Sequence, residues 1–155
     1  MKQLLIVLIL MSAASFTYAN DNRERVNQTL DALHHNASIA DTDEYFNLYH
    51  DTAVFIGTDA SEVWNKEAFK AYAKPHFDKG KGWTYHPKTR NVYFSPNQDV
   101  VWFDELLDNE SLGETRGTGV LIKEEGRWKI TQYHLTIPIP NALADSVAKQ
   151  IKAAQ

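Results

Sequence analysis

The chain has 155 residues, a formal net charge of −4 at pH 7 and no cysteine. Hydrophobic residues make up 43% of it, which is enough for one domain with a real core. The lack of cysteine excludes disulfides and thiolate metal sites. A mildly acidic chain without a basic run also argues against nucleic acid or an anionic membrane surface as a partner.

The first 19 residues have the layout of a secretory signal peptide. Lys2 precedes an apolar run over residues 4–11, and the segment ends in Ala19. The run is far shorter than the ~20 residues of a membrane span, which argues against a retained membrane anchor. We therefore expect a signal peptide over residues 1–19 and a domain over residues 20–155. That domain would be secreted or periplasmic, with no membrane contact after cleavage.

The signal peptide predicts where the mature chain begins. Sequencing the N-terminus of protein recovered from its own host should give Asn20, or a residue within one or two positions of it. The physical reason is that Ala19 places a small residue at the cleavage site. An intact Met1 in the soluble fraction would contradict export.

The first half of the domain is predicted to be mainly helical. Apolar residues recur at helical spacing over residues 20–40, and Asp41 with Glu44 forms a capping box that starts a second helix. A short strand is expected over residues 53–57, before Asn65 caps a third helix.

Pro75 lies inside this third helix, which should therefore kink or break near Ala73. The second half of the domain then changes to an alternating pattern. From residue 83 onward apolar and polar residues alternate with period two, and turn residues separate the segments. Strands are expected over residues 83–86, 91–95, 100–107, 114–123 and 127–137, followed by a weak amphipathic helix over residues 141–155.

The order of these segments resembles a known family. With YFNLYHDTAVFIGTDASEVW, AFKAYAKPHF, VVWFDELL and RGTGVLIKEEGRWKITQYHLTIPIPN, the chain is similar to a SnoaL-like domain of the nuclear-transport-factor-2-like superfamily over about residues 26–141. The resemblance implies an α+β fold, in which a cone-shaped, curved antiparallel sheet wraps around three N-terminal helices. The superfamily includes isomerases, cyclases, dehydratases, kinase association domains and binding modules, so this fold does not fix the function.

The last predicted hairpin gathers polar side chains on one sheet face. If residues 124–126 form a three-residue turn, the pairing of the two strands follows by counting back from it. The residues sharing this face are then Trp128, Ile130 and two polar pairs: Arg116 opposite His134, and Thr118 opposite Gln132. The preceding strand would place Asp104 or Glu105 opposite Arg116, depending on its register.

A carboxylate, a guanidinium and an imidazole on adjacent strands could bind a polar ligand or position a general base. In that interpretation Asp104 or Glu105 is the base, Arg116 stabilises charge and His134 carries a proton. The alternative is a cross-strand ion pair with a hydrogen-bonded histidine, on a solvated face or at a dimer interface. The candidate ligand-binding residues are Arg116, Thr118, Gln132 and Tyr133.

The opposite face is predicted to be apolar with one carboxylate. It carries Phe103, Gly117, Gly119, Leu121, Tyr133 and Leu135, with either Glu105 or Asp104. Two glycines on one strand face leave space for a ligand or for a closely packed helix. This face could equally be the interior of the cone's pocket, and the sequence leaves the choice open.

Other residues limit the chemistry. The superfamily's isomerases carry a base aspartate where this chain has Gly57 or its neighbours, so ketosteroid-type proton transfer is not expected. Asp59 and Glu62 could be paired carboxylates at the mouth of the cone, although a side-chain turn at Asp59 and a solvated Glu62 explain them as well. The six histidines form no HxH or HExxH spacing, so no metal and no cofactor are expected.

We therefore expect an exported SnoaL-like domain that binds a small organic molecule and forms a homodimer through its sheet, whose faces carry aromatic residues. One alternative is an isomerase, cyclase or hydratase that uses a sheet carboxylate as general base. Another is a dimerisation module with a vestigial pocket.

Overall fold

The computed structural model describes residues 21–154. The predicted signal peptide lies outside the described residues, so export stays a prediction. A helix over residues 21–38 opens the described part. The elements that follow are α2 (Thr42–Asn47), β1 (Tyr49–Ile56), β2 (Val63–Asn65), α3 (Lys66–Phe77), β3 (His86–Phe94), β4 (Val100–Asn109), β5 (Gly113–Glu124), β6 (Arg127–Thr136), a 3-10 turn η1 (Asn141–Leu143) and α4 (Ala144–Ala154).

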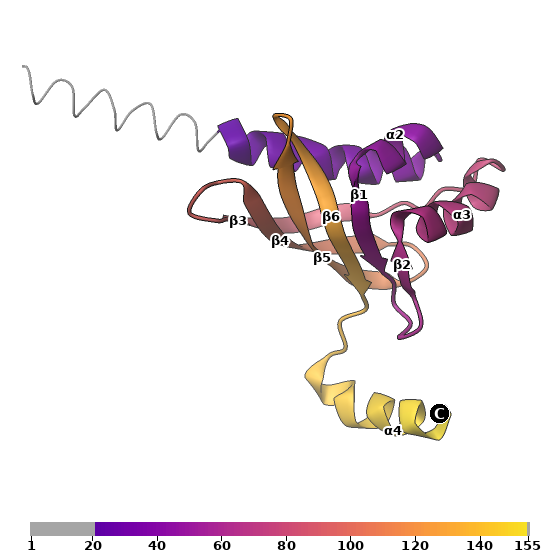
Figure 1. The fold of residues 1–155 in the computed structure, drawn as a ribbon. Coiled ribbons are helices and arrows are strands. Elements are labelled where there is room, and N and C mark those ends of the chain that lie inside the picture. The colour runs from indigo at the N-terminus through magenta and orange to yellow at the C-terminus, as the bar shows by residue number, and fades with distance from the viewer. Residues whose placement is uncertain (1–20, 155) are drawn as a thin grey trace, which may run out of the picture.

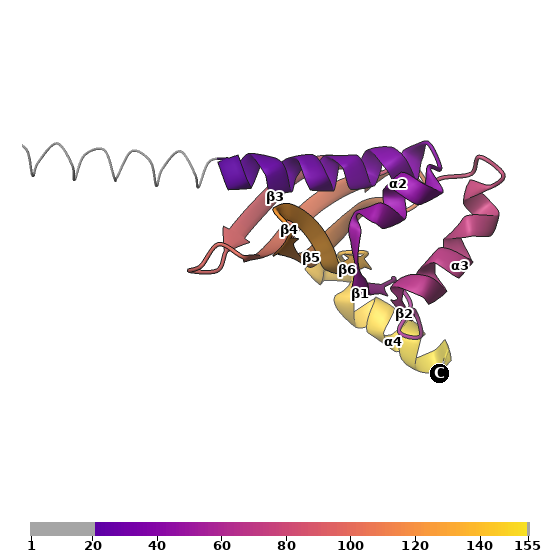
Figure 2. The same ribbon diagram turned by 45° about the horizontal axis from the view of Figure 1, so that its top comes forward.

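The six strands form one curved, unclosed sheet in the order β2-β1-β6-β5-β4-β3. All neighbouring strands are antiparallel except β1 and β6, which pair in parallel. The sheet is therefore mixed, whereas a wholly antiparallel sheet was predicted. The N-terminal helix lies along one face of this sheet, and α2 and α3 stand at one end of it (Figures 1 and 2). The result is the expected α+β fold, with the helices against the inner face of a curved sheet.

Helices α2 and α3 start at the N-caps that the sequence predicted for them. The Asp41 side chain accepts a hydrogen bond from the backbone N–H of Glu44 at 3.0 Å, and the Asn65 side chain accepts one from Ala68 at 2.8 Å. A kink or a break was predicted near Ala73, and the break is wrong, because α3 continues through Pro75 to Phe77. Pro75 lies in the last turn, so little helix follows the one backbone hydrogen bond that its missing N–H removes.

The strand predictions need two corrections in the middle of the chain. One strand, β3, replaces the two expected over residues 83–86 and 91–95, and residues 83–85 are not strand. Pro87 at its start is tolerated because β3 is the edge of the sheet and has a bulge between Pro87 and Thr89. The short strand β2, which pairs with β1, was not predicted.

The β5–β6 hairpin differs from the predicted register in two ways. Glu124 pairs with Arg127, so the turn has two residues, both with positive φ (48° at Glu125 and 77° at Gly126). A bulge then shifts the register by one more residue, which pairs Leu121 with Ile130 and Val120 with Gln132. As a result Thr118 lies opposite His134, and Arg116 lies opposite Thr136. Trp128 and Ile130 precede the bulge and are buried on the inner face, not on the polar face as expected.

The core lies between the helices and the inner face of the sheet. The apolar stripe predicted for the N-terminal helix is buried there against alternate residues of β4, β5 and β6. By contrast α4 extends beyond the sheet and buries none of its residues (Figure 1). Between residues 21 and 154 there is no helix with the length and apolar character that a membrane span requires.

Candidate functional site

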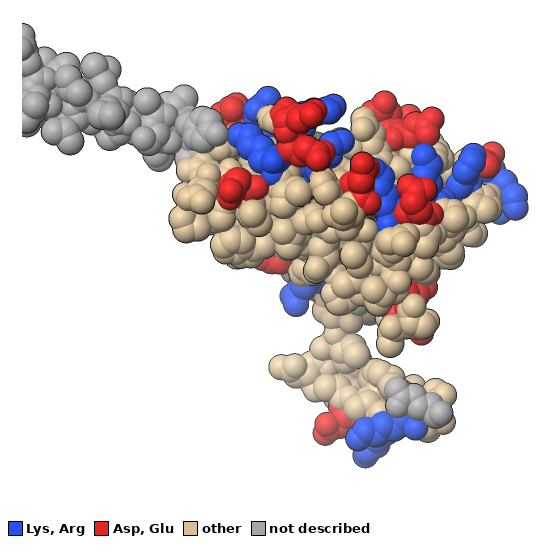
Figure 3. Space-filling model, in the orientation of Figure 1, with Lys and Arg blue, Asp and Glu red and all other residues tan. Residues whose placement is uncertain are grey.

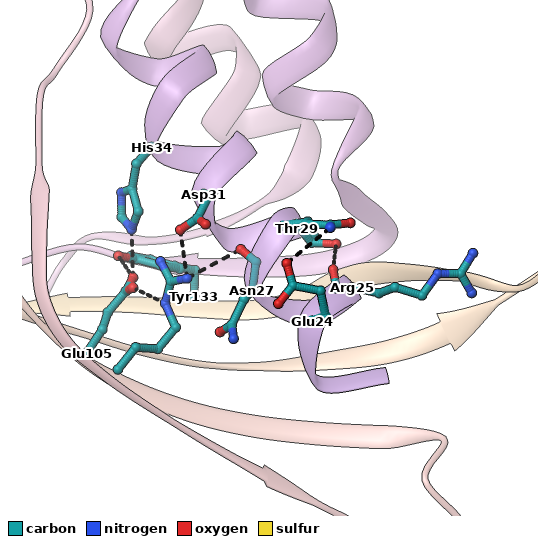
Figure 4. Close-up of polar contacts among 10 residues, drawn as sticks. Glu24, Arg25, Asn27, Thr29, Asp31, His34, Glu105 and Tyr133 are labelled. Atoms are coloured by element: carbon teal, nitrogen blue, oxygen red, sulfur yellow. Dashed lines mark hydrogen bonds and ion pairs between the residues drawn. The ribbon is translucent and has the colours of Figure 1, made fainter. Parts of the chain in front are cut away.

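A buried carboxylate organises the inner face of the sheet. Glu105, on β4, is 0% exposed. It accepts hydrogen bonds from Nε2 of His34 at 2.8 Å, from Nε of Arg90 at 2.8 Å and from the hydroxyl of Tyr133 at 3.2 Å (Figure 4). The N-terminal helix, β3 and β6 each supply one of these donors, so the group ties three parts of the fold to one side chain.

Gly117 makes this arrangement possible. It lies on β5 directly opposite Glu105, on the strand that separates β4 from β6. A Cβ at this position would lie 2.4 Å from the Tyr133 hydroxyl oxygen and 3.0 Å from Oε1 of Glu105. Gly117 therefore makes room for the side chain of Tyr133. It does not make room for a ligand or for a closely packed helix.

The charges of this group balance one another. Burial by itself raises the pKa of Glu105, but the hydrogen bonds and charges of His34 and Arg90 together hold it below its ordinary value. Burial and the neighbouring Glu105 carboxylate raise the pKa of Tyr133 well above its ordinary value, so its hydroxyl stays a donor. Arg90 also donates through Nη1 to Asp31 at 2.8 Å and so fastens the N-terminal helix to the sheet edge.

A cavity of about 210 Å³ lies beside this group. His34 and Tyr133 form part of its wall, whereas Glu105 lies behind them and does not line it. The remaining polar lining is Thr58 and Glu62, and no Lys or Arg lines the cavity. Half of the lining residues are Phe, Tyr or Trp: Tyr45, Phe55, Trp64, Phe69, Tyr72, Trp83, Tyr85 and Tyr133.

His34 is one of the polar groups in the cavity wall. Its Nε2 is held by Glu105, and its other ring nitrogen, Nδ1, makes no hydrogen bond to any residue between 21 and 154. Because an ionised carboxylate only accepts, Nε2 carries a proton, and Nδ1 is an acceptor whenever the ring is neutral. Within the described part of the chain, no group of three or more His, Asp and Glu residues is arranged to hold a metal ion.

A family model described as a SnoaL-like domain matches residues 26–140. The chain belongs to the SnoaL-like domain family. A search of curated proteins found no match.

Solved structures share the fold of this SnoaL-like domain. An NTF2-like protein of unknown function from Pseudomonas putida KT2440 is 15% identical, with 76% of this chain and 87% of that chain covered at a TM-score of 0.64. A protein provisionally called a dehydratase of the NTF2-like family, from Streptomyces avermitilis, is 11% identical, with 79% and 99% covered at 0.68. Another provisionally called a scytalone dehydratase, from Novosphingobium aromaticivorans, is 10% identical, with 77% and 89% covered at 0.64. At these identities the likeness shows the fold alone.

The residues predicted for the site of this SnoaL-like domain divide between the two sheet faces. Tyr133 lines the cavity, and Glu105 lies directly behind it. The other candidates alternate with buried neighbours and lie on the outer face, away from the cavity: Asp104, Arg116, Thr118, Gln132 and His134.

The expected pairing of Arg116 with a carboxylate is wrong. Leu106 lies opposite Arg116 on β4, while Glu105 lies opposite Gly117 and Asp104 opposite Thr118. Asp104 accepts a hydrogen bond from the side chain of Asn91 at 3.1 Å. The guanidinium that binds Glu105 is Arg90, on the other neighbouring strand of the SnoaL-like sheet.

Sequence reasoning missed His34 and Arg90. A signal was present for His34, because it follows Leu30 by four residues and so continues the apolar stripe of the N-terminal helix. Arg90 had no such signal, because it falls in the gap between two segments that were interpreted as separate strands.

Proposed function

We propose that this SnoaL-like domain binds a small, mainly aromatic organic molecule in the cavity and holds a polar atom of that molecule through Nδ1 of His34. The observation that carries the proposal is the bond between Glu105 and Nε2 of His34. This bond fixes the orientation and the tautomer of the ring at the cavity wall, as a buried carboxylate does behind a ligand-binding histidine.

The size and lining of the cavity support the same ligand class. An engineered apolar cavity of ~150 Å³ binds benzene, so about 210 Å³ has room for a substituted ring. Aromatic walls with a few polar groups are typical of sites for small organic molecules. A hydroxyl on such a ring could donate to His34.

The proposal predicts how a matched pair of probes binds. 4-Ethylphenol should bind more tightly than its methyl ether, because only the phenol can donate a hydrogen bond to Nδ1. His34→Ala should remove this difference, at a cost of about 0.5–1.5 kcal/mol in the binding of the phenol. Titrations followed by NMR chemical shifts measure both affinities.

The control is His134→Ala, which removes an imidazole from the outer face and should leave both affinities unchanged. Equal binding of the two probes to the wild-type protein would contradict a role for His34 in holding the ligand. Native mass spectrometry of protein from its own host would look for a retained natural ligand.

One observation favours a second candidate, a proton-transfer enzyme. A histidine oriented by a buried carboxylate beside a cavity can act as a general base, with Glu105 as its positioning residue. Two proteins with the same fold are provisionally called dehydratases. Incubation with cyclic ketones in D₂O should then show deuterium exchange next to the carbonyl by NMR, and His34→Ala should abolish the exchange while His134→Ala keeps it.

We also propose that the domain forms a homodimer through the outer face of its sheet. Tyr93 and Trp102 are 44% and 48% exposed on that face, with stacked rings whose centroids are 6.0 Å apart. In the view of Figure 3, charged side chains gather mainly along the upper edge of the domain, and its middle carries few of them. Exposed apolar sheet surface of this kind is a common dimer contact.

Light scattering on the mature protein should therefore give twice the chain mass. Trp102→Glu should shift it towards the monomer, because the change buries an unpaired charge in the contact. Ile39→Glu is the control, since Ile39 is 57% exposed on the helical side of the domain and should not affect the mass. A clean monomer across the micromolar range would refute the dimer. A dimer that binds none of the probes would favour the dimerisation module.

A further inference from the structure

Glu62 places an unbalanced negative charge on the cavity wall. It is the acidic residue among the lining side chains, and no Lys or Arg joins it there. Among residues 21–154 it forms no ion pair, and its carboxylate accepts one hydrogen bond, from the backbone N–H of Asp59 at 3.2 Å. Most of its hydrogen-bonding capacity therefore remains available to a ligand.

The β1–β2 hairpin holds this carboxylate at the cavity. The backbone N–H of Gly57 donates to the carbonyl of Glu62 at 2.9 Å, which closes the hairpin. A Cβ on Gly57 would lie only 2.1 Å from Oε2 of Glu62. The carboxylate therefore lies against the glycine backbone, in space that any other side chain at this position would occupy. Both residues line the cavity, near the exposed lining residues Thr58 and Tyr72 that mark its mouth.

Aromatic rings surround the same corner. Trp64, two residues after Glu62, stacks on Tyr72 with ring centroids 4.9 Å apart and an interplanar angle of 19°. Phe55 stacks beside Trp64 at 6.0 Å. Tyr72 ends this stack and is 49% exposed, and an aromatic ring face with a nearby carboxylate is a way to recognise an ammonium group.

We propose that the ligand of this cavity is an organic cation, in which an ammonium group contacts Glu62, Trp64 and Tyr72 and an aromatic or aliphatic body extends towards His34. This inference rests on the proposed binding function and narrows its ligand class. A neutral molecule fits the aromatic walls but gains no charge interaction with Glu62. An anion meets a carboxylate and no cationic residue in the lining.

The test uses two probes of the same shape, benzyltrimethylammonium and neopentylbenzene, which differ by one positive charge. Titrations of the full domain, followed by NMR chemical shifts, should show the cation binding about tenfold or more tightly. Glu62→Gln should remove this preference and leave the binding of neopentylbenzene unchanged. Glu67→Gln, at an exposed position that does not line the cavity, should keep the preference.

The outcomes separate this inference from the function on which it rests. Equal binding of the two probes by the wild-type protein overturns the cation preference, while the cavity still binds aromatic molecules. A preference that survives in Glu62→Gln overturns the role of this carboxylate. If neither probe binds and the phenol pair also fails, the proposed binding function is overturned together with the inference.

Discussion

Replacing Arg90 by alanine is expected to lower the free energy of unfolding by about 3–5 kcal/mol, the usual cost of removing one partner from a buried ion pair. The Arg90 side chain is 11% exposed and that of Glu105 is 0% exposed, so water cannot replace the lost guanidinium. The variant leaves Glu105 with two donors and leaves Asp31 without its partner. Urea denaturation followed by circular dichroism measures the change.

Arg116→Ala is the matched control for this experiment. Arg116 is exposed, and it forms no ion pair within residues 21–154. Its loss should change stability by no more than about 0.5 kcal/mol, as at most surface positions. Arg90→Lys should fall between the two, because an ammonium cannot contact Glu105 and Asp31 through a planar fork. Similar small losses for both alanine variants would mean that the buried pair contributes little.

The contrast between these arginines shows where sequence reasoning was sufficient. Alternation assigned residues to sheet faces correctly for β5, because side chains of a strand must alternate, but it left the faces of Asp104 and Glu105 on β4 open. It therefore placed Gly117 on one face with Tyr133, and Arg116 on the other with His134. The caps at Asp41 and Asn65 were also predictable, since the hydrogen bonds of a helix start are local.

Cross-strand partners were less predictable, because they depend on small features that accumulate. The two-residue turn and the bulge in the last hairpin each shift the register by one residue. The shorter turn moved Trp128 and Ile130 to the inner face, and the bulge then returned Gln132 and His134 to the outer face, with every pair changed. Neither feature has a sequence signal strong enough to separate it from a three-residue turn with glycine at its end.

The contacts of the site itself come from residues far apart in the chain. His34 and Glu105 are 71 positions apart, and Arg90 reaches Glu105 from an edge strand that the sequence pattern divided in two. A histidine on an apolar helix stripe is buried by its position, but its partner is decided by the strand that the helix crosses. For the same reason the Glu62 carboxylate needed the hairpin geometry before its contact with the Gly57 backbone could be recognised.

Glu105→Gln is expected to destabilise the domain by about 3–5 kcal/mol at neutral pH, because a neutral amide leaves Arg90 without its buried counterion. The effect should also depend on pH. The pKa of Glu105 in the folded protein lies below its ordinary value of 4.5. The stability that its ionised form contributes is therefore fully present above about pH 4.5, and is lost as the pH falls through the lower pKa of the folded state.

The difference in unfolding free energy between wild type and Glu105→Gln should accordingly shrink as the pH falls below about 4.5. Other carboxylates with lowered pKa values, such as Asp51 and Glu114, are present in both proteins and cancel in the comparison. Asp104→Asn, on the outer face, is the control and should cost much less, since the Asp104 side chain accepts a hydrogen bond from Asn91 outside the core. A difference for Glu105→Gln that stays constant down to pH 3 would show that the ionised carboxylate does not stabilise this group. The proposal that the same carboxylate orients His34 at the cavity would then lose its support.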